Sequence, residues 1–333
     1  MNKKSIFSLL FVIVAIVMLF FYDAEEKREY LHRDGLVFGT MYSVTYSNPE
    51  AQDLSVQIGR ALEGVNNSLS MFNAESTIAK VNNNEAVVLD SMFLTVWEKG
   101  QEVSRATEGA FDMTVAPLVD LWGFGLKNKS VVTVAQVDSI RQYVGYELAV
   151  LEDGAIRKAY AEMRIDAGAI AKGYACDVVA DLLRNNGCEN LLVDIGGEVV
   201  LQGVNQNGNP WRVGITRPTV DAKGAEKELQ EIIESTQLCM ATSGNYLQYY
   251  FVDGQRRSHT IDPRTGYPVQ HGLLSATVVA SSCMRADALA TACMVLGEAD
   301  ALKMIEQTDD AACYLIVASG DSLQITVSNN WKY

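Results

Sequence analysis

Apolar residues recur along several segments of the chain with the spacing of amphipathic helices. In residues 53–72, Leu54, Ile58, Val65 and Leu69 follow one another at steps of four or seven residues. These steps place the four side chains on one face of a helix. The same kind of spacing predicts helices at residues 91–107, 133–145, 168–185 and 286–296. The last of these segments is apolar on every side, so we expect it to be buried.

Short apolar runs bounded by turn residues predict strands between these helices. Residues 36–46 form one such run, and the pairs Asp153-Gly154, Asp253-Gly254 and Gly320-Asp321 are typical of hairpin turns. Because hairpins outnumber helical crossovers, the pattern favours an α+β fold with mainly antiparallel sheets and packed helices. We expect residues 36–333 to form one domain with two lobes.

The N-terminus differs from the rest of the chain. Lys3 and Lys4 precede an apolar run at residues 6–22, and charged residues follow it at 23–35. The run is either a long signal-peptide core or a short membrane anchor. Bulky residues stand where a cleavage site needs small ones, so an uncleaved anchor is favoured. We then expect residues 1–5 in the cytoplasm, 23–35 as a linker, and the main domain on the periplasmic side of the inner membrane.

The charge balance excludes one class of partner. The chain has 27 Lys and Arg residues against 41 Asp and Glu residues, a formal charge of −14. Nucleic-acid binding needs a basic surface, so we do not expect it here. An acidic protein that binds phosphates needs a metal ion or backbone donors to offset its own field.

The six cysteines show no C-x-x-C pair, which argues against a zinc site or a thioredoxin-like motif. An even number allows disulfides in an oxidising compartment. Most of the six are flanked by apolar residues, however, and buried free thiols are the interpretation that we favour.

One candidate site lies in the segment Gly-Ala-Ile-Ala-Lys-Gly at residues 168–173, which follows Asp166. Asp166 is suited to cap a helix N-terminus. Small residues behind it would let backbone N–H groups approach an anion, and Lys172 adds a positive charge. A tightly packed helix start explains the same residues equally well.

Asp287 and Thr291 form a second candidate. They stand four residues apart, on one face of the predicted helix at 286–296. A carboxylate and a hydroxyl are oxygen ligands that suit Mg²⁺, which takes its other ligands from water and substrate phosphates. Such pairs are also common on solvent faces. The apolar helix around this pair favours the functional interpretation, because a buried Asp requires a partner.

Two further segments carry candidate chemistry. Residues 258–266 contain His259 and Asp262 between polar residues and a Pro/Gly stop. His259 would act there as a general base or a phosphate-facing donor, or the segment is a polar loop organised by Asp262. Residues 109–125 interleave aromatic residues with glycines. Such rings stack on planar ligands, but more often they pack in a core.

Together these segments resemble the FAD:protein FMN transferases of the ApbE family. The resemblance spans residues 36–325, and its motifs occur in the family's order. They are Gly-Thr-Met-Tyr at 39–42, Leu-Ser-Met-Phe at 69–72, Gly-Ala-Phe-Asp-Met-Thr at 109–114, Asp-Ala-Gly-Ala-Ile-Ala-Lys-Gly at 166–173, Asp-Ile-Gly-Gly at 194–197, Ala-Thr-Ser-Gly-Asn-Tyr at 241–246, His-Thr-Ile-Asp-Pro-Arg-Thr-Gly at 259–266 and Asp-Ala-Leu-Ala-Thr at 287–291.

The resemblance implies a Mg²⁺-dependent enzyme that splits FAD. It moves FMN onto a Thr hydroxyl of an exported acceptor protein of a flavin-dependent redox system and releases AMP. By motif position, Asp287 and Thr291 resemble the Mg²⁺ ligands, with the backbone carbonyl of Ala169 as a third. The residues that resemble FAD contacts are Met41, Phe72, Ala110, Phe111, Asp112, Asp166, Lys172, His259 and Ile261. Phe72 stands where many members carry Tyr.

Three catalytic roles follow as hypotheses. Lys172 would help to hold the phosphates, and His259 would take the proton of the acceptor hydroxyl. Asp262 is either an alternative base or a loop organiser. Two other functions compete with this one: a Mg²⁺-dependent FAD pyrophosphatase, in which water replaces Thr, and a non-catalytic flavin-binding protein of the cell envelope. The reaction product distinguishes the pyrophosphatase, which would release free FMN, from the transferase. The pair Asp287 and Thr291 argues against the non-catalytic protein, which would need no metal ligands.

Overall fold

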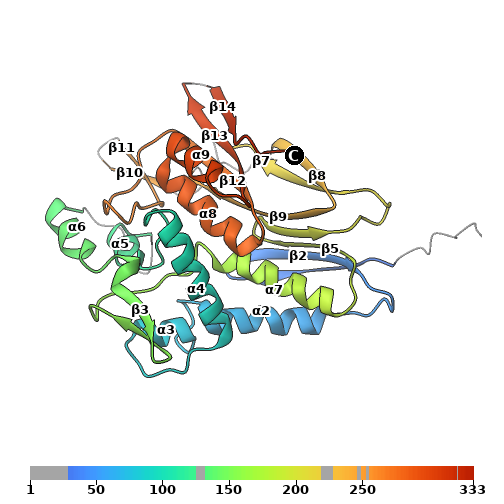
Figure 1. Ribbon diagram of the computed structural model, residues 1–333, viewed down its shortest axis with the longest axis horizontal. Coiled ribbons are helices and arrows are strands. Elements are labelled where there is room, and N and C mark those ends of the chain that lie inside the picture. Colours follow the sequence, from blue (N-terminus) through green and yellow to red (C-terminus); the bar gives the residue numbers. More distant parts are fainter. Residues whose placement is uncertain (1–28, 125–131, 219–227, 246–248, 253–254, 321) are drawn as a thin grey trace, which may run out of the picture.

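An antiparallel sheet of eight strands organises the described part of the chain (Figure 1). The structure is a computed structural model that describes residues 29–124, 132–218, 228–245, 249–252, 255–320 and 322–333. The strand order is β1-β2-β5-β6-β9-β12-β13-β14, and each neighbouring pair is antiparallel. The strands are β1 (Leu31–Val37), β2 (Thr40–Ser47), β5 (Asn190–Ile195), β6 (Glu198–Gln202), β9 (Gln237–Gly244), β12 (Leu273–Val279), β13 (Ala312–Ser319) and β14 (Ser322–Val327).

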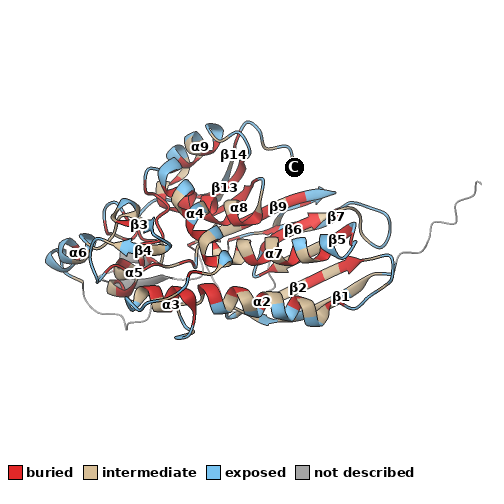
Figure 2. Ribbon diagram, turned by 60° about the horizontal axis from the view of Figure 1, so that its bottom comes forward, coloured by how far each residue is buried: buried red, intermediate tan, exposed pale blue. Residues whose placement is uncertain are grey.

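Helices cover one face of this sheet. Helix α7 contacts β5 and β6, α8 contacts β9 and β12, α9 contacts β13, and α2 packs on α7. The apolar sides of these helices and the sheet enclose the larger core, while the sides turned away are exposed (Figure 2). The helices are α2 (Ser55–Leu69), α4 (Ser91–Ala106), α7 (Ala171–Asn185), α8 (Cys283–Leu296) and α9 (Glu298–Glu306).

A hairpin covers part of the other face of the sheet. Strands β7 (Trp211–Thr216) and β8 (Leu229–Ser235) pair antiparallel, and Trp211, Ile215 and Ile233 pack with residues of β6, β9 and β13 in a second core. The remaining elements are α3 (Thr77–Asn82), α5 (Ala116–Leu121), α6 (Val134–Arg141), the 3-10 helix η1 (Tyr146–Leu148) and the pairs β3 (Ala149–Glu152) with β4 (Ala155–Lys158) and β10 (Tyr249–Val252) with β11 (Gln255–Ser258).

The predicted fold class is confirmed: the chain mixes helices with mainly antiparallel sheets in a single domain. The predicted helices correspond to α2, α4, α6, α7 and α8, although α6 stops at Arg141 and a 3-10 turn follows. Helix α8 is buried along most of its length, as its uniformly apolar sequence predicts. The short helices α3 and α5 and the helix α9 were not predicted. Two of them span six residues, too few for a helical period to repeat.

The prediction of one strand at residues 36–46 is wrong. This segment contains the end of β1, a two-residue turn and most of β2, and Val37 pairs with Thr40 across the turn. Phe38 and Gly39 both have positive φ, at 52° and 74°. Such turns favour Asn or Asp before Gly. Because a bulky Phe rarely adopts this conformation, the sequence carried no turn signal here.

The N-terminal predictions fall mostly outside the structure. The cytoplasmic segment and the apolar run, residues 1–22, precede the described residues. Residues 31–35, which were expected in a linker, instead form most of β1, whose alternate residues His32, Asp34 and Leu36 are exposed at the edge of the sheet. In the part of the chain that the structure describes, no helix has the length and apolar character needed to cross a membrane.

All six cysteines lie within the described residues and are free thiols, and every one except Cys239 is fully buried. Cys176 and Cys283 direct their thiols at backbone carbonyls, those of Glu198 and Met240. The expectation of buried free thiols is confirmed.

Helices α7 and α8 cross in close contact at Gly173 (Figure 1). A Cβ atom at this glycine would lie 2.3 Å from the backbone oxygen of Cys283 and 2.8 Å from the Cβ of Asp287. Any side chain here would therefore push the two helices apart, because close-packed backbone cannot yield by that distance.

We expect the substitution Gly173→Ala to lower the free energy of unfolding by about 1–3 kcal/mol, the usual cost of overpacking a core. The matched control is Gly59→Ala in α2, where a Cβ would meet nothing within 4 Å. There Ala should raise stability by about 0.5–1 kcal/mol through helix propensity alone. Urea unfolding of the two variants measures the difference. Equal effects of both substitutions would contradict the close crossing.

Candidate active site

A cavity of about 950 Å³ opens where helices α7 and α8 meet the end of the sheet at the turn between β5 and β6. Its volume lies at the upper end of the range for small-molecule sites. The lining comes from segments far apart in the sequence, including Thr40–Ser43, Ala110–Met113, Gly168, Ala169, Lys172, Gly196, Gly197, Arg212–Gly214, Thr242–Gly244, His259–Ile261, Asp287 and Thr291.

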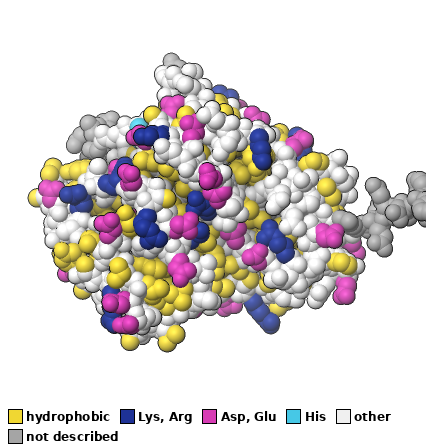
Figure 3. Space-filling model, in the orientation of Figure 1, with side chains coloured by type: hydrophobic (Ala, Val, Ile, Leu, Met, Phe, Trp, Pro, Cys, Tyr) yellow, Lys and Arg dark blue, Asp and Glu magenta, His cyan; other side chains and the backbone are white. Residues whose placement is uncertain are grey.

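One face of the molecule carries charges of both signs. On the face seen in Figure 3, Lys and Arg side chains are scattered among Asp and Glu side chains. This face shows no continuous basic area of the kind that a nucleic-acid backbone requires.

Helix α8 is held at its N-terminus by groups from two elements. The N-cap Ser282 accepts a hydrogen bond from the Arg285 N–H. Asp177 of α7 accepts bonds from the next two free donors, the N–H groups of Cys283 at 2.9 Å and Met284 at 2.8 Å. Burial raises the pKa of Asp177 to about 6, although these two bonds oppose the rise. Asp177 thereby fixes α8 against the helix that carries Lys172.

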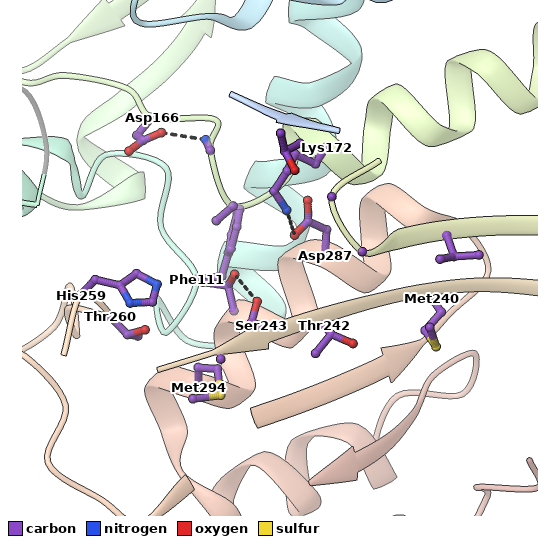
Figure 4. A pocket seen from close by; sticks show the side chains of 18 of the residues that line it. Phe111, Asp166, Lys172, Met240, Thr242, Ser243, His259, Thr260, Asp287 and Met294 are labelled. Carbon is purple, nitrogen blue, oxygen red and sulfur yellow. Dashed lines mark hydrogen bonds and ion pairs between the residues drawn. The ribbon is translucent and has the colours of Figure 1, made fainter. Parts of the chain in front are cut away.

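Lys172 lies between two buried carboxylates (Figure 4). Its Nζ is 2.6 Å from Oε1 of Glu198 and 3.9 Å from Oδ1 of Asp287. Glu198 is 1% exposed and Asp287 is 2% exposed. Burial raises the pKa of Glu198, and the charge of Lys172 opposes this rise. Burial alone would lower the pKa of Lys172, but the attraction of Asp287 and Glu198 outweighs it and raises that pKa.

The three predicted metal ligands lie in one cavity and offer three oxygen atoms. Oδ2 of Asp287 accepts a hydrogen bond from the Gly173 N–H. This N–H therefore makes no helical hydrogen bond to the backbone carbonyl of Ala169, four residues earlier. Thr291 lies one turn after Asp287, with its Oγ1 3.2 Å from Oγ of Ser243. A carboxylate, a hydroxyl and a backbone carbonyl match the preference of Mg²⁺ for a few oxygen ligands completed by phosphates and water.

This donor set is the chemistry that the site offers a cation. Among the described residues, no group of three His, Cys, Asp or Glu side chains could hold a metal ion. The described residues therefore contain no metal site built from such side chains alone. A cation in this cavity would take its remaining ligands from a backbone carbonyl and from the oxygen atoms of a bound ligand.

Asp166 does not cap α7, which corrects the prediction from the sequence. Its Oδ1 accepts a hydrogen bond from the Gly168 N–H at 2.7 Å, and a turn at residues 167–170 precedes the helix, which begins at Ala171 with Ile170 as N-cap. The short side chain closes its own local turn instead of reaching the helix. Burial raises the pKa of Asp166, and its carboxylate lines the cavity.

Asp112 orders the segment opposite. One of its oxygens accepts bonds from the N–H and the hydroxyl of Thr114, and the other accepts one from the Tyr146 N–H at 2.8 Å. Burial raises the pKa of this carboxyl despite these bonds. Its neighbours Ala110 and Phe111 are buried and line the cavity, so the backbone of this segment faces the ligand space.

The segment with His259 reaches the cavity through its first residues. His259, Thr260 and Ile261 line the cavity, and the His259 ring meets that of Phe124 edge-on, with centroids 6.3 Å apart. Asp262 lies outside the lining and accepts two bonds from the Arg264 guanidinium. Of the two roles predicted for Asp262, the geometry favours that of loop organiser.

The other predicted flavin contacts divide into two kinds. Met41 lines the cavity and is 65% exposed, whereas Phe72 is 82% exposed and lies outside the lining. Of the described residues that the sequence singled out, only Phe72 and Asp262 are not part of the lining.

Sequence reasoning missed Glu198 and Ser243. Ser243 lies in the motif at residues 241–246, whereas Glu198 directly follows the motif that ends at Gly197. A charged residue inside the apolar strand at residues 198–201 was the available signal for Glu198, because a buried charge needs a partner.

The sequence model of the ApbE family matches residues 38–315. A relative from Vibrio cholerae named "FAD:protein FMN transferase" is 37% identical over 95% of this chain and 96% of its own length. The protein of that name from Escherichia coli K12 is 31% identical over 90% of this chain and 87% of its own.

Solved structures give the same result. The "Flavin Transferase ApbE from Vibrio cholerae" superposes with a TM-score of 0.82 at 38% identity, covering 91% of this chain and 98% of its own. The flavinyl transferase ApbE of Pseudomonas stutzeri, in its apo form, gives a TM-score of 0.82 at 30% identity, with 91% and 95% covered.

The raised pKa of Asp177 predicts a pH dependence of stability. The folded state holds this proton more tightly than the unfolded chain, so the contribution is fully present below pH 4 and is lost as the pH rises through about 6. Relative to Asp177→Asn, the natural protein should lose about 1–3 kcal/mol of unfolding free energy between pH 4.5 and pH 7. Urea unfolding of both proteins at the two pH values measures this. A difference that grows in favour of Asp177 as the pH rises would contradict it.

Proposed function

The chain belongs to the ApbE family, and we propose that it transfers the FMN half of FAD to a threonine hydroxyl of an acceptor protein, with Mg²⁺ and with release of AMP. The observation that carries this proposal is the meeting of Lys172, Asp287 and Thr291, from two helices, in one cavity large enough for a dinucleotide. The names of the relatives support the transferase activity, and the site chemistry supports the finer statements.

The reaction exchanges a phosphoanhydride bond for a phosphate ester bond. The acceptor hydroxyl oxygen forms a bond to the phosphorus of the FMN half. The bond from that phosphorus to the bridging diphosphate oxygen breaks, and AMP leaves with the electron pair. A bound Mg²⁺ would offset the diphosphate charge and the charge that grows on AMP.

The residues of this chain then have four tasks. Asp287, Thr291 and the Ala169 carbonyl would hold the cation. Lys172, as a fixed positive charge, would hold the diphosphate near them. The backbone of residues 110–112 and the side chains of Met41, Asp166 and Ile261 would orient the two ends of FAD.

The proton of the acceptor hydroxyl needs a destination, and His259 is the candidate. It is the only histidine among the residues that line the cavity. Imidazole accepts a proton readily near neutral pH. Asp262 is less suited to this task, because its carboxylate is committed to Arg264.

The compartment follows as part of the same proposal. An anchor at residues 6–22 would hold the enzyme at the inner membrane with its cavity on the periplasmic side, where exported acceptor proteins of flavin-dependent redox systems fold. Protease accessibility of the C-terminus in spheroplasts tests this orientation. Protection of the C-terminus in intact spheroplasts would contradict it.

The direct test is incubation of the full-length protein with FAD, Mg²⁺ and a candidate acceptor domain. Flavin fluorescence of the acceptor in a denaturing gel reports covalent transfer, and release of AMP should match it mole for mole. Addition of EDTA should abolish both signals. Free FMN with no flavin on protein would instead identify a pyrophosphatase.

We expect Asp287→Ala to reduce the transfer rate at least about 100-fold, because the cation loses its only charged protein ligand. The control is Asp181→Ala, which removes an exposed carboxylate from the same helix as Lys172 but outside the cavity lining. Initial rates of flavin fluorescence and thermal melting of both variants are the measurements. Full transfer activity in Asp287→Ala would disprove the metal site.

We expect His259→Gln to lower the transfer rate about 10²–10⁴-fold, the usual effect of losing a general base, while FAD still binds. Equilibrium binding of FAD in the absence of acceptor, followed by flavin fluorescence, separates the two effects. A variant that binds FAD poorly but turns over normally at saturating FAD would assign His259 to substrate binding alone.

A further inference from the structure

Lys172 is shared unequally between its two carboxylates. Its Nζ contacts Oε1 of Glu198 at 2.6 Å, a charge-assisted hydrogen bond, and stands 3.9 Å from Oδ1 of Asp287, beyond hydrogen-bond distance. Asp287 has its other oxygen, Oδ2, engaged by the Gly173 N–H. The oxygen of Asp287 that a cation would use is therefore the one that Lys172 faces but does not bind.

The buried position of Glu198 beside Lys172 is energetically unfavourable for a carboxylate. It begins β6 directly after the glycine pair 196–197 and is 1% exposed. Among the described residues its second oxygen, Oε2, is buried and has no hydrogen-bond partner. Because a buried carboxylate with an unpartnered oxygen is unfavourable, packing alone gives no reason for a Glu at this position.

The charges explain the arrangement. Two carboxylates and one lysine give the cluster a formal charge of −1 when both acids are ionised. A divalent cation on Asp287 would change this to +1, and it would stand close to the lysine. Without Glu198, Lys172 would have Asp287 as its sole buried counterion, and lysine and cation would compete for the same oxygen.

We propose that Glu198 is a positioning residue that holds Lys172 away from Oδ1 of Asp287 and so keeps this oxygen available to a divalent cation. The inference rests on the metal site of the proposed function. It assigns Glu198 no contact with FAD or the acceptor protein, so its effect passes through Lys172.

Binding of Mn²⁺ to the full-length protein tests the proposal without any turnover. The electron paramagnetic resonance signal of free Mn²⁺ is followed as protein is added, without ligand and again with FAD but no acceptor. We expect Glu198→Gln to weaken Mn²⁺ binding about tenfold, the usual scale for residues that orient metal ligands. The Gln keeps the size of the side chain but no longer offsets the charge of Lys172.

The double variant Lys172→Met/Glu198→Gln separates the proposed route from a direct effect of the Glu198 charge. If Glu198 acts only by restraining Lys172, the double variant should bind Mn²⁺ without FAD as tightly as Lys172→Met does. A direct effect of the Glu198 charge would instead leave the double variant weaker than Lys172→Met. Lys172→Met alone should bind Mn²⁺ without FAD no more weakly than the natural protein. This single variant keeps the test decisive if Glu198→Gln does not fold.

Three results obtained without FAD would overturn the inference: unchanged Mn²⁺ affinity in Glu198→Gln, weaker Mn²⁺ binding in the double variant than in Lys172→Met, or weaker Mn²⁺ binding in Lys172→Met than in the natural protein. A purely structural role of Glu198 would lower the melting temperature and leave the affinity unchanged. If the natural protein binds no Mn²⁺ with or without FAD, the metal site of the proposed function fails first, and the two failures are distinguishable.

Discussion

The close crossing of α7 and α8 at Gly173 is the contact on which the site depends. A glycine at this point allows the two helix backbones to approach, and its N–H donates to Asp287 rather than to a carbonyl of its own helix. The bond that packs the helices therefore also orients a predicted metal ligand. Asp177 adds a second connection between the same helices, since its carboxylate takes the first free N–H groups of α8. Lys172 on one helix and Asp287 on the other are held in register by the packing of the core rather than by the loops around the cavity.

Buried charge is the second constraint, and it acts against stability. Glu198 and Asp287 are withdrawn from water beside the half-buried Lys172, and such clusters seldom stabilise a protein relative to apolar residues of the same volume. Burial also raises the pKa of Asp112 and Asp166 across the cavity. Several buried acids around one cleft favour a functional explanation, because groups with perturbed pKa values concentrate where chemistry occurs. The apolar body of α8, by contrast, contributes the core that offsets this cost.

The sequence predicted what local pattern and chemistry determine. The helices at α2, α4 and α8 follow from apolar spacing, and Asp287 and Thr291 were found because an acid inside an apolar helix needs a reason. What it could not predict depends on contacts between distant segments. Phe38 has a positive φ in the turn across which β1 pairs with β2, and Glu198 meets Lys172 only because β6 begins beside the start of α7. The sequence suggested that Asp166 caps a helix. Whether an Asp caps a helix or closes a local turn depends on the residue at which the helix begins, and a difference of two or three residues changes the outcome.

The net charge of −14 sets the final problem for a protein that handles a diphosphate. A strongly acidic chain repels phosphates at long range, so attraction has to be local and short-ranged. The cavity lining contains two positive side chains, Lys172 and Arg212, each paired with a carboxylate, and it offers oxygen ligands for a cation rather than a basic surface. This choice has a consequence for selectivity. A site whose positive charge arrives largely with a bound cation attracts ligands that can also coordinate that cation, and a diphosphate chelates it better than a single phosphate does. With a cation bound, the acidity that argues against nucleic-acid binding would therefore also favour a dinucleotide joined through its two phosphates.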